Sequence, residues 1–401
     1  LAVSCCSQEI LAAKQREQVE TLGMPAELIR KVLIQGNIVS ALRNPVTSLH
    51  KGISMSRHRG EIFAEPVLKH LPEVSVVYRK EHTIDEALDA MGMPRPIPGK
   101  VSYLIGGKDF FHDLHHSVRG AREYVDTRTF IFDNDDVAKQ YADLLKKKSQ
   151  TVRCRVLMDE LGSIASWWKT PGVAERPERK PESIVDYLKN GGNVSVRKSR
   201  NPWLVTDHAK QIIIDGKIAY LGGMNIGREY RYDWHDMMIK VSGPVVTAIQ
   251  NDFNRAWGLQ GGWGDWGLPF RSELNYRDRK VPGEIDIRIL KTAAGRTEIE
   301  RAMIAAVRMS RDRVWVQNPY FTSSQLLKEM LRAKARGVDV RMIFPHENDS
   351  TLLQRNNRSI AKRMLDGGIH VYKYKPKFSH VKAMVVDGWA CVGSANMDTL
   401  S

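Results

Sequence analysis

The chain has 401 residues, of which 42% are hydrophobic and 27% charged, so it is long enough for two domains, or for one duplicated domain with an extension. No apolar run approaches the roughly 20 residues of a membrane-spanning helix, and four scattered cysteines are too few for a disulfide framework or a zinc site. The net charge of +15 favours a polyanionic partner, either nucleic acid or the surface of an anionic membrane.

Residues 1–99 differ from the rest of the chain and are predicted to form a largely helical N-terminal extension. Helix-like patterns occur near 8–22 and 26–42, and the extension ends in the proline-rich stretch 94–99. The first five residues resemble the end of a bacterial lipoprotein signal, whose cleavage would leave an acylated Cys5. The alternative is an arbitrary fragment boundary followed by a helical extension. An acylated Cys5 predicts a location in the bacterial envelope, and without it a cytoplasmic, peripheral membrane protein is predicted.

Between 100 and 258, short β-branched runs alternate with amphipathic stretches, a pattern that is typical of βαβ units and predicts a first α/β lobe. The strand-like runs lie at 101–105, 124–132, 152–158, 193–198 and 210–222. The segment that follows, 259–283, opens with a glycine-rich stretch that contains Trp263 and Trp266. Its hydrophobic residues show neither helical nor strand periodicity. We therefore predict that it links two lobes.

The same order of elements returns at 284–401, which predicts a second α/β lobe and an internal repeat. The run from Arg153 to Met158 corresponds to the run from Val338 to Phe344, and the glycine pair at 191–192 corresponds to the pair at 367–368. The sequence stops at Ser401, directly after a motif, which favours a second lobe that is truncated at its C-terminus.

A set of polar residues recurs at equivalent places in the two repeats. The first set is His208, Lys210, Asp215 and Asn225, and the second is His380, Lys382, Asp387, Ser394 and Asn396. Because residues two apart on a strand project from one face, each histidine and its lysine should point into a common cationic pocket. Each aspartate is expected to hold an imidazole nitrogen and so to fix its tautomer. Two ordinary core histidines are the alternative, but the recurrence at equivalent positions argues against it.

The first set fits the pattern H-x-K-x4-D-x6-G-[SG]-x-N, and the second departs from it only in having five residues between Asp387 and Gly393. Over residues 100–401 the chain thereby resembles the phospholipase D superfamily. Further segments resemble its cardiolipin synthase branch: Asp207-His208, Gly222 to Tyr230, Trp234 to Asp236, Gly243-Pro244, Asn318 to Phe321 and Asn348 to Ser350. The resemblance implies a duplicated phospholipase D-like fold, with two α/β/α lobes and the active site between them.

The resemblance also implies a phosphohistidine mechanism that needs no metal or other cofactor. His208 is expected to attack phosphorus and His380 to act as general acid and base, and the near-symmetric half-sites leave the opposite assignment open. Lys210 and Lys382 are expected to bind the non-bridging phosphate oxygens, where another phosphodiesterase would use metal ions. The residues expected to help them are Asn225, Ser394 and Asn396. The trio His112, His115 and His116 has a spacing that could hold a metal, but a solvated helix face is the preferred interpretation.

The principal hypothesis is a bacterial cardiolipin synthase-like phosphatidyltransferase that acts on phosphatidylglycerol-type phospholipids at a membrane surface. The alternatives are a phospholipase D-type hydrolase, a nuclease of the same superfamily acting on DNA, and a non-catalytic envelope lipoprotein. Basic residues before each histidine would surround the mouth of the pocket or line an ordinary strand edge. They are Arg197, Lys198, Arg200, Lys373, Lys375 and Lys377. The stretch Trp167-Trp168-Lys169 suits an anchor at a membrane interface, or core packing of one tryptophan.

Overall fold

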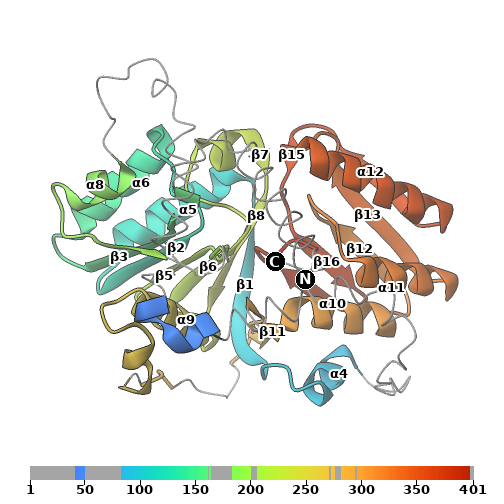
Figure 1. Ribbon diagram of the computed structural model, residues 1–401, viewed down its shortest axis with the longest axis horizontal. Coiled ribbons are helices and arrows are strands. Elements are labelled where there is room, and N and C mark those ends of the chain that lie inside the picture. The colour runs from blue at the N-terminus through green and yellow to red at the C-terminus, as the bar shows by residue number, and fades with distance from the viewer. Residues whose placement is uncertain are drawn as a thin grey trace, which may run out of the picture.

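The computed structural model describes residues 41–49, 83–160, 162–163, 183–199, 206–270, 272–275, 281–293 and 296–397. Two lobes, each built on a large β-sheet, lie side by side (Figure 1). Of the predicted extension, residues 41–43 and 45–49 are helical, whereas Cys5, the pattern at 8–22 and most of 26–42 lie outside the described residues. The stretch Trp167-Trp168-Lys169 lies outside them too. Among the described helices, none combines the length and the apolar character that crossing a membrane requires.

The first lobe contains an eight-stranded sheet in the order β4-β3-β2-β5-β6-β8-β1-β9. Its strands are β1 (Ile97–Ile105), β2 (Tyr124–Thr129), β3 (Arg153–Asp159), β4 (Ser195–Ser199), β5 (Gln211–Ile214), β6 (Ile218–Gly222), β8 (Met237–Ser242) and β9 (Ile285–Ile287). Strands β2, β3 and β4 are parallel, and the other neighbouring pairs are antiparallel. All four residues of β5 are buried, because helices cover both faces of the sheet.

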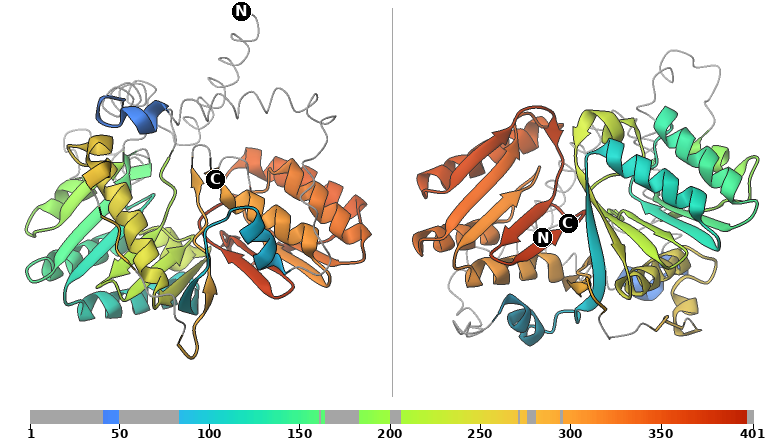
Figure 2. Two further views of the ribbon diagram at one scale, coloured as in Figure 1. Left: turned by 90° about the horizontal axis from the view of Figure 1, so that it is seen from below. Right: turned by 180° about the vertical axis from the view of Figure 1, so that it is seen from behind.

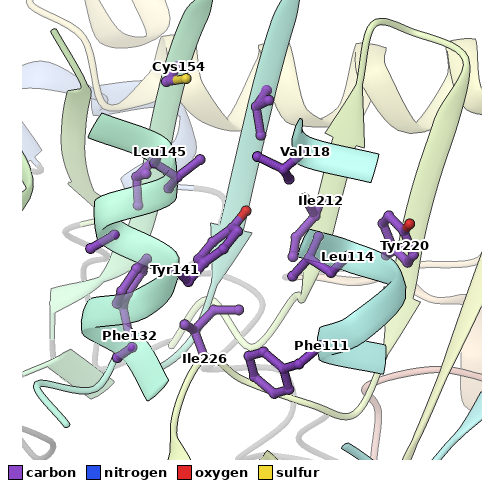
Figure 3. Close-up of a cluster of buried hydrophobic side chains, with 14 of the residues drawn as sticks. Phe111, Leu114, Val118, Phe132, Tyr141, Leu145, Cys154, Ile212, Tyr220 and Ile226 are labelled. Atoms are coloured by element: carbon purple, nitrogen blue, oxygen red, sulfur yellow. The ribbon is translucent and has the colours of Figure 1, made fainter. Parts of the chain in front are cut away.

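The helices of the first lobe are α5 (Gly107–Gly120), α6 (Asp136–Lys148), α8 (Ile184–Lys189) and α9 (Val245–Leu259). The first three pack on one face of the sheet and α9 packs on the other. Figure 3 shows how the first of these layers is filled: Phe111, Leu114 and Val118 recur at helical spacing on α5 and lie over the sheet beside Tyr141 and Leu145 of α6.

The second lobe repeats the core of the first. Its sheet has the order β14-β13-β12-β16-β17, which matches β4-β3-β2-β5-β6 in strand direction as well as in order. The strands are β12 (Arg313–Gln317), β13 (Asp339–Pro345), β14 (His370–Tyr374), β16 (Ala383–Val386) and β17 (Trp389–Val392), and the helices are α10 (Glu298–Met309), α11 (Ser324–Ala335) and α12 (Thr351–Asp366). The predicted internal repeat and duplicated α/β fold are confirmed. The three helices share one buried cluster with the sheet, so they pack on one of its faces.

The predicted linker and the end of the predicted extension are shared between the lobes. Strand β9, expected to open the second lobe, pairs with β1 and so extends the first sheet. Strand β1 itself begins at Ile97, inside the proline-rich stretch that was expected to be a boundary. Gly99 is required there, because a Cβ atom would lie 2.6 Å from Cγ1 of Val245 on α9. An edge strand of three residues such as β9 shows no periodicity in the sequence, so its partner cannot be predicted from the sequence.

Helix α4 (Ile84–Ala90) belongs to the predicted extension but packs on the second lobe (Figure 2). Its Leu88 joins a buried cluster with Ala302 and Ala305 of α10. Arg288, just beyond β9, forms ion pairs with Asp85 and Asp89 of α4, at 2.9 and 2.8 Å. Because the chain crosses between the lobes before β1 and again after β9, two segments tie the lobes together.

The shorter elements are a π-helical turn at Glu229–Asp233, β7 (Trp234–His235), a 3₁₀ helix at Gly264–Phe270, β10 (Thr292–Ala293), β11 (Arg296–Thr297) and β15 (Phe378–Ser379).

Candidate active site

The two histidine-lysine pairs meet where the lobes face each other. Each pair precedes a strand, although it had been expected to lie on one. His208 and Lys210 come just before β5, which begins at Gln211, and His380 and Lys382 lie between β15 and β16. Nδ1 of His208 is 3.1 Å from the carbonyl oxygen of Ser394, which belongs to the opposite lobe. Each lysine donates a hydrogen bond from Nζ to the carbonyl oxygen of its own histidine, at 2.8 Å for Lys210 and 2.7 Å for Lys382. The structure thus brings both pairs into one buried, cationic site.

A short parallel ladder holds the lobes together beside this site. It pairs β7 of the first lobe with β15 of the second. The backbone N–H of His380 continues the ladder by donating to the carbonyl oxygen of His235, at 2.7 Å. Nζ of Lys377 donates to the carbonyl oxygen of Tyr232 across the same junction. The position of His380 is therefore fixed by backbone contacts with the other lobe.

The basic residues that were predicted to surround the pocket mouth differ in their surroundings. Lys373, Lys375 and Lys377 are exposed on the stretch that leads to His380. The guanidinium of Arg197 instead lies over the ring of Trp257, 4.3 Å from its centroid, and donates to the Trp257 carbonyl oxygen at 2.6 Å. Arg197 therefore stabilises the packing of α9 on β4. Lys198 lies on β4, and Arg200 is outside the described residues.

Burial and the crowding of positive charges set the protonation of the site. The pKa of His208 lies well below its ordinary value because the ring is buried and because Lys210, Lys382 and His380 lie nearby. Burial, followed by the charge of Lys382, lowers the pKa of His380 to about 4, even though Asp236 opposes the change. Burial and Lys382 also place the pKa of Lys210 well below its ordinary value. Before a substrate binds, both imidazoles are therefore neutral at neutral pH.

Asp236 is the carboxylate that contacts a reacting histidine. It is fully buried, and its Oδ2 lies 2.7 Å from Nδ1 of His380 across the junction between the lobes. Its Oδ1 accepts the N–H of Met237, at 2.8 Å. Gly223 makes room for it, since a Cβ there would lie 2.4 Å from the same carboxylate. Because Nδ1 carries the proton in this hydrogen bond, the lone pair of Nε2 is left to react.

The prediction that Asp215 and Asp387 orient the histidines is wrong. Asp215 accepts the backbone N–H groups of Arg122, Glu123 and Tyr124, at 2.9, 2.8 and 2.9 Å. Asp387 does the same with the three residues that begin at Arg311, at 2.9, 3.0 and 2.9 Å. The physical reason is distance: five residues of extended strand carry each aspartate roughly 16 Å beyond its lysine. Both residues have a positive φ, of 52° and 51°, and close the hairpin at the far end of the strand.

Replacing Asp215 with asparagine should therefore lower stability and leave chemistry largely intact. Burial raises the pKa of this carboxyl, but the three backbone hydrogen bonds outweigh it and the net pKa lies below its ordinary value. A lowered pKa means that the stabilisation is present above the unfolded pKa of about 4 and is lost as the pH falls through the folded pKa. Urea unfolding at neutral pH should give a loss of about 1–2 kcal/mol for Asp215→Asn. A fall in kcat for the folded variant, without loss of stability, would contradict this structural role.

The residues expected to bind phosphate have well-defined neighbours. Asn225 is buried, its Oδ1 accepts the N–H of Ile131 at 3.0 Å, and its Nδ2 donates to the hydroxyl of Tyr230 at 2.7 Å. The second hydrogen of Nδ2 is the one that could reach a phosphate oxygen. Ser394 contacts His208 through its carbonyl oxygen, and Asn396 lies half-buried in the corresponding turn of the second lobe. A contact of these residues with phosphate stays a prediction.

Aromatic rings surround the reacting groups unequally. The ring of Phe130 lies 4.9 Å from that of His208 and 5.1 Å from Nζ of Lys210. Four rings lie around His380: Trp234 at 5.0 Å, Phe378 at 5.9 Å, Tyr230 at 6.2 Å and Tyr320 at 6.3 Å. The proximity of Asp236 and of these rings to the histidines was not predicted. Tyr230, Trp234, Asp236 and Tyr320 lie in the segments 222–230, 234–236 and 318–321 that resemble the family, where they had been given no role, and Phe130 and Phe378 lie outside those segments.

The three histidines of α5 differ in their surroundings. His112 and His116 are exposed, as a solvated helix face requires, but His115 is half-buried and its ring stacks on Tyr141 at 6.1 Å. Burial lowers the pKa of His115 to about 4. The neighbouring Asp113 accepts hydrogen bonds from Tyr220 and Lys240. In the part of the chain that the structure describes, no group of metal-binding side chains occurs.

Comparison with known proteins agrees with this geometry. A family model described as "Cardiolipin synthase, PLD-like domain" matches residues 114–257 and 303–401. "Cardiolipin synthase A" of Pseudomonas fluorescens is 30% identical over 328 residues, which cover 77% of this chain and 64% of that protein. "Cardiolipin synthase 2" of Staphylococcus epidermidis is 28% identical over 316 residues, covering 74% and 61%. The chain thus spans less than two thirds of the length of these relatives.

Among solved structures, the phosphatidylserine synthase of Haemophilus influenzae Rd KW20 superimposes with a TM-score of 0.56, covering 76% of this chain and 80% of that one. At 13% identity this likeness concerns the fold alone. The family model, by contrast, spans more than half of the chain and includes both histidine-lysine pairs. The chain belongs to the phospholipase D superfamily, in the family of cardiolipin synthase PLD-like domains.

Proposed function

We propose that the protein is a cardiolipin synthase-like phosphatidyltransferase that acts on phosphatidylglycerol-type phospholipids at a membrane surface. The observation that carries the proposal is the meeting of two neutral imidazoles with two buried lysines between the lobes. A phosphodiester is anionic and repels anionic nucleophiles, and a neutral imidazole in a cationic pocket removes that barrier. The curated relatives that bear the name cardiolipin synthase support the same substrate class.

The unequal surroundings of the histidines favour His208 as the nucleophile. Asp236 is close to His380, where its negative charge can stabilise an imidazolium ion. Among the described residues, the hydrogen-bond partner of His208 Nδ1 is the carbonyl oxygen of Ser394. A carbonyl dipole stabilises an imidazolium ion less than a carboxylate does, so protonation of His208 is less favourable. The group that has to carry and release a proton is accordingly His380, and the group that has to stay neutral is His208.

The proposed reaction has two displacements at phosphorus. In the first, Nε2 of His208 forms a bond to phosphorus while the bond to the leaving alcohol breaks. His380, whose Nε2 takes up a proton from solvent when the anionic phosphodiester binds and raises its pKa, gives that proton to the alcohol. In the second, the incoming hydroxyl gives its proton to His380 and attacks phosphorus, which releases His208. Lys210 and Lys382 neutralise the non-bridging oxygens throughout, with Asn225 and Asn396 as further donors. Water as the acceptor would yield phosphatidic acid, and a lipid glycerol hydroxyl would yield cardiolipin.

The pH dependence of the reaction should report the lowered pKa of Lys210. Because the charged lysine is needed to bind the anion, kcat/KM should fall as the pH rises through this pKa, below the value of about 10.4 for an ordinary lysine. A bound phosphodiester raises the pKa of Lys210, so the alkaline limb of kcat should lie at higher pH. Initial rates across the alkaline range measure both limbs. Lys210→Arg, which stays charged, should lose the limb in kcat/KM, and an unchanged limb in that variant would contradict the assignment.

The test of the proposal uses purified protein with labelled phosphatidylglycerol vesicles and, separately, single-stranded DNA. Formation of cardiolipin with release of glycerol, lost in both His208→Ala and His380→Ala, is the expected result. Cleavage of DNA without lipid turnover would overturn the proposal in favour of a nuclease. Phosphatidic acid as the only product would assign a hydrolase, and lipid binding without turnover would assign a non-catalytic role.

A further inference from the structure

Two loops of the second lobe lie beside the site, although the proposed mechanism assigns them no role. They are the segments 318–321 and 348–350, and amide side chains tie the first segment to the second and to α12. Nδ2 of Asn348 and Nδ2 of Asn357 both donate to the carbonyl oxygen of Pro319, at 3.1 and 2.7 Å. Oδ1 of Asn318 accepts the N–H of Tyr320, at 3.1 Å. The backbone around Tyr320 is therefore held firmly relative to the second loop.

Tyr320 reaches from these loops into the site. Its ring lies 6.3 Å from the ring of His380 and 6.4 Å from that of Phe378, between centroids. Its hydroxyl donates to Oδ1 of Asp349 at 2.6 Å. Burial raises the pKa of Tyr320 well above its ordinary value, and the charges of Asp349 and Asp236 act in the same direction. The hydroxyl therefore stays protonated and couples the surroundings of His380 to Asp349, whose side chain is exposed.

The position next to His380 identifies which part of a substrate these groups would meet. In an in-line displacement the departing and arriving alcohols occupy the side of phosphorus opposite the nucleophile. His208 is the proposed nucleophile, so the alcohol lies on the His380 side, where Tyr320 stands. A carboxylate at this place is unsuited to the phosphate, which it repels, but it is a strong acceptor for hydroxyl groups.

We infer that Tyr320 and Asp349 bind the hydroxyl groups of a polyol headgroup and so select the alcohol that is exchanged at phosphorus. The inference rests on the proposed phosphatidyl transfer. The hydroxyl oxygen of Tyr320 and the second carboxylate oxygen of Asp349 provide neighbouring acceptors, which suit the adjacent hydroxyls of a glycerol group. An ammonium headgroup could bind to the carboxylate of Asp349, but the positive charges of the two lysines would repel it.

The experiment separates the two halves of the reaction by using vesicles that contain phosphatidyl-p-nitrophenol, a donor whose leaving group has no polyol. Release of nitrophenolate reports the first displacement, and the products formed with added glycerol, ethanol or ethanolamine report the second. In Asp349→Asn and Tyr320→Phe, the KM for glycerol should rise about tenfold or more. Transfer to ethanol and hydrolysis should change by less than about twofold. Glu347→Gln, which removes an exposed charge from the same loop, is the matched control and should behave like the wild type.

Three outcomes would overturn the inference. One is an equal loss of glycerol transfer, ethanol transfer and hydrolysis, which assigns the loops a structural role. Another is a loss confined to ethanolamine, which assigns an ammonium site. The third is an unchanged preference in both variants. Failure of the proposed function looks different, because the wild type would then release no nitrophenolate and form no phosphatidyl product.

Discussion

His208→Ala should lower kcat for phosphatidyl transfer by more than about 10⁴-fold, because no other neutral imidazole stands at the nucleophile position. The loss should be the same for natural donors and for donors with an activated leaving group, since both need the bond between Nε2 and phosphorus. Steady-state rates with phosphatidylglycerol and with phosphatidyl-p-nitrophenol measure this.

The control for that variant is His112→Ala, which removes an exposed histidine from α5 and should leave both rates unchanged. Because His208 is packed against Phe130, the thermal midpoint of each variant should be recorded to exclude unfolding. Residual transfer within about tenfold of the wild type in a folded His208→Ala protein would contradict the nucleophile assignment.

Asp236→Asn should lower kcat by about 10²- to 10⁴-fold with a natural donor, the range that positioned proton transfer contributes. The substitution removes the negative charge 2.7 Å from Nδ1 of His380 and with it the stabilisation of the imidazolium ion. A nitrophenolate leaving group needs no proton, so the first displacement with the activated donor should be affected far less. Single-turnover rates with the two donors separate these effects.

Asp233→Asn is the matched control, because it removes an exposed carboxylate three residues earlier in the chain. Its single-turnover rates with both donors should equal those of the wild type. An equal loss with both donors in Asp236→Asn would show that the residue maintains the junction between the lobes and does not assist proton transfer.

Much of the architecture could be predicted because it depends on local sequence patterns. Alternating β-branched and amphipathic runs gave the α/β class, and the recurrence of His208 and Lys210 as His380 and Lys382 gave the duplication, which the strand order confirms. Each histidine lies two residues from its lysine, so the two stay close in any fold, and this is why the pairs could be placed from the sequence. The strand that was expected to carry each pair begins one residue after the lysine, at Gln211 and at Ala383.

What could not be predicted depends on contacts between distant segments. Asp215 was expected near a histidine, yet the length of β5 carries it to the opposite end of the sheet. Asp236 contacts His380 only because β7 and β15 pair across the lobes, and two-residue strands have no period to reveal them. Likewise, the packing of α4 on α10 and the pairing of β9 with β1 each depend on two distant segments, so neither segment alone predicts the contact.

The measurement that tests the account most directly is the capture of the covalent intermediate in His380→Ala. With phosphatidyl-p-nitrophenol this variant should release one burst of nitrophenolate and then stop, because no base activates the incoming alcohol. Peptide mass spectrometry after an alkaline quench should then find the phosphatidyl group on His208. A burst that leaves the label elsewhere, or turnover without any burst, would contradict the proposed phosphohistidine and the division of roles between the two histidines.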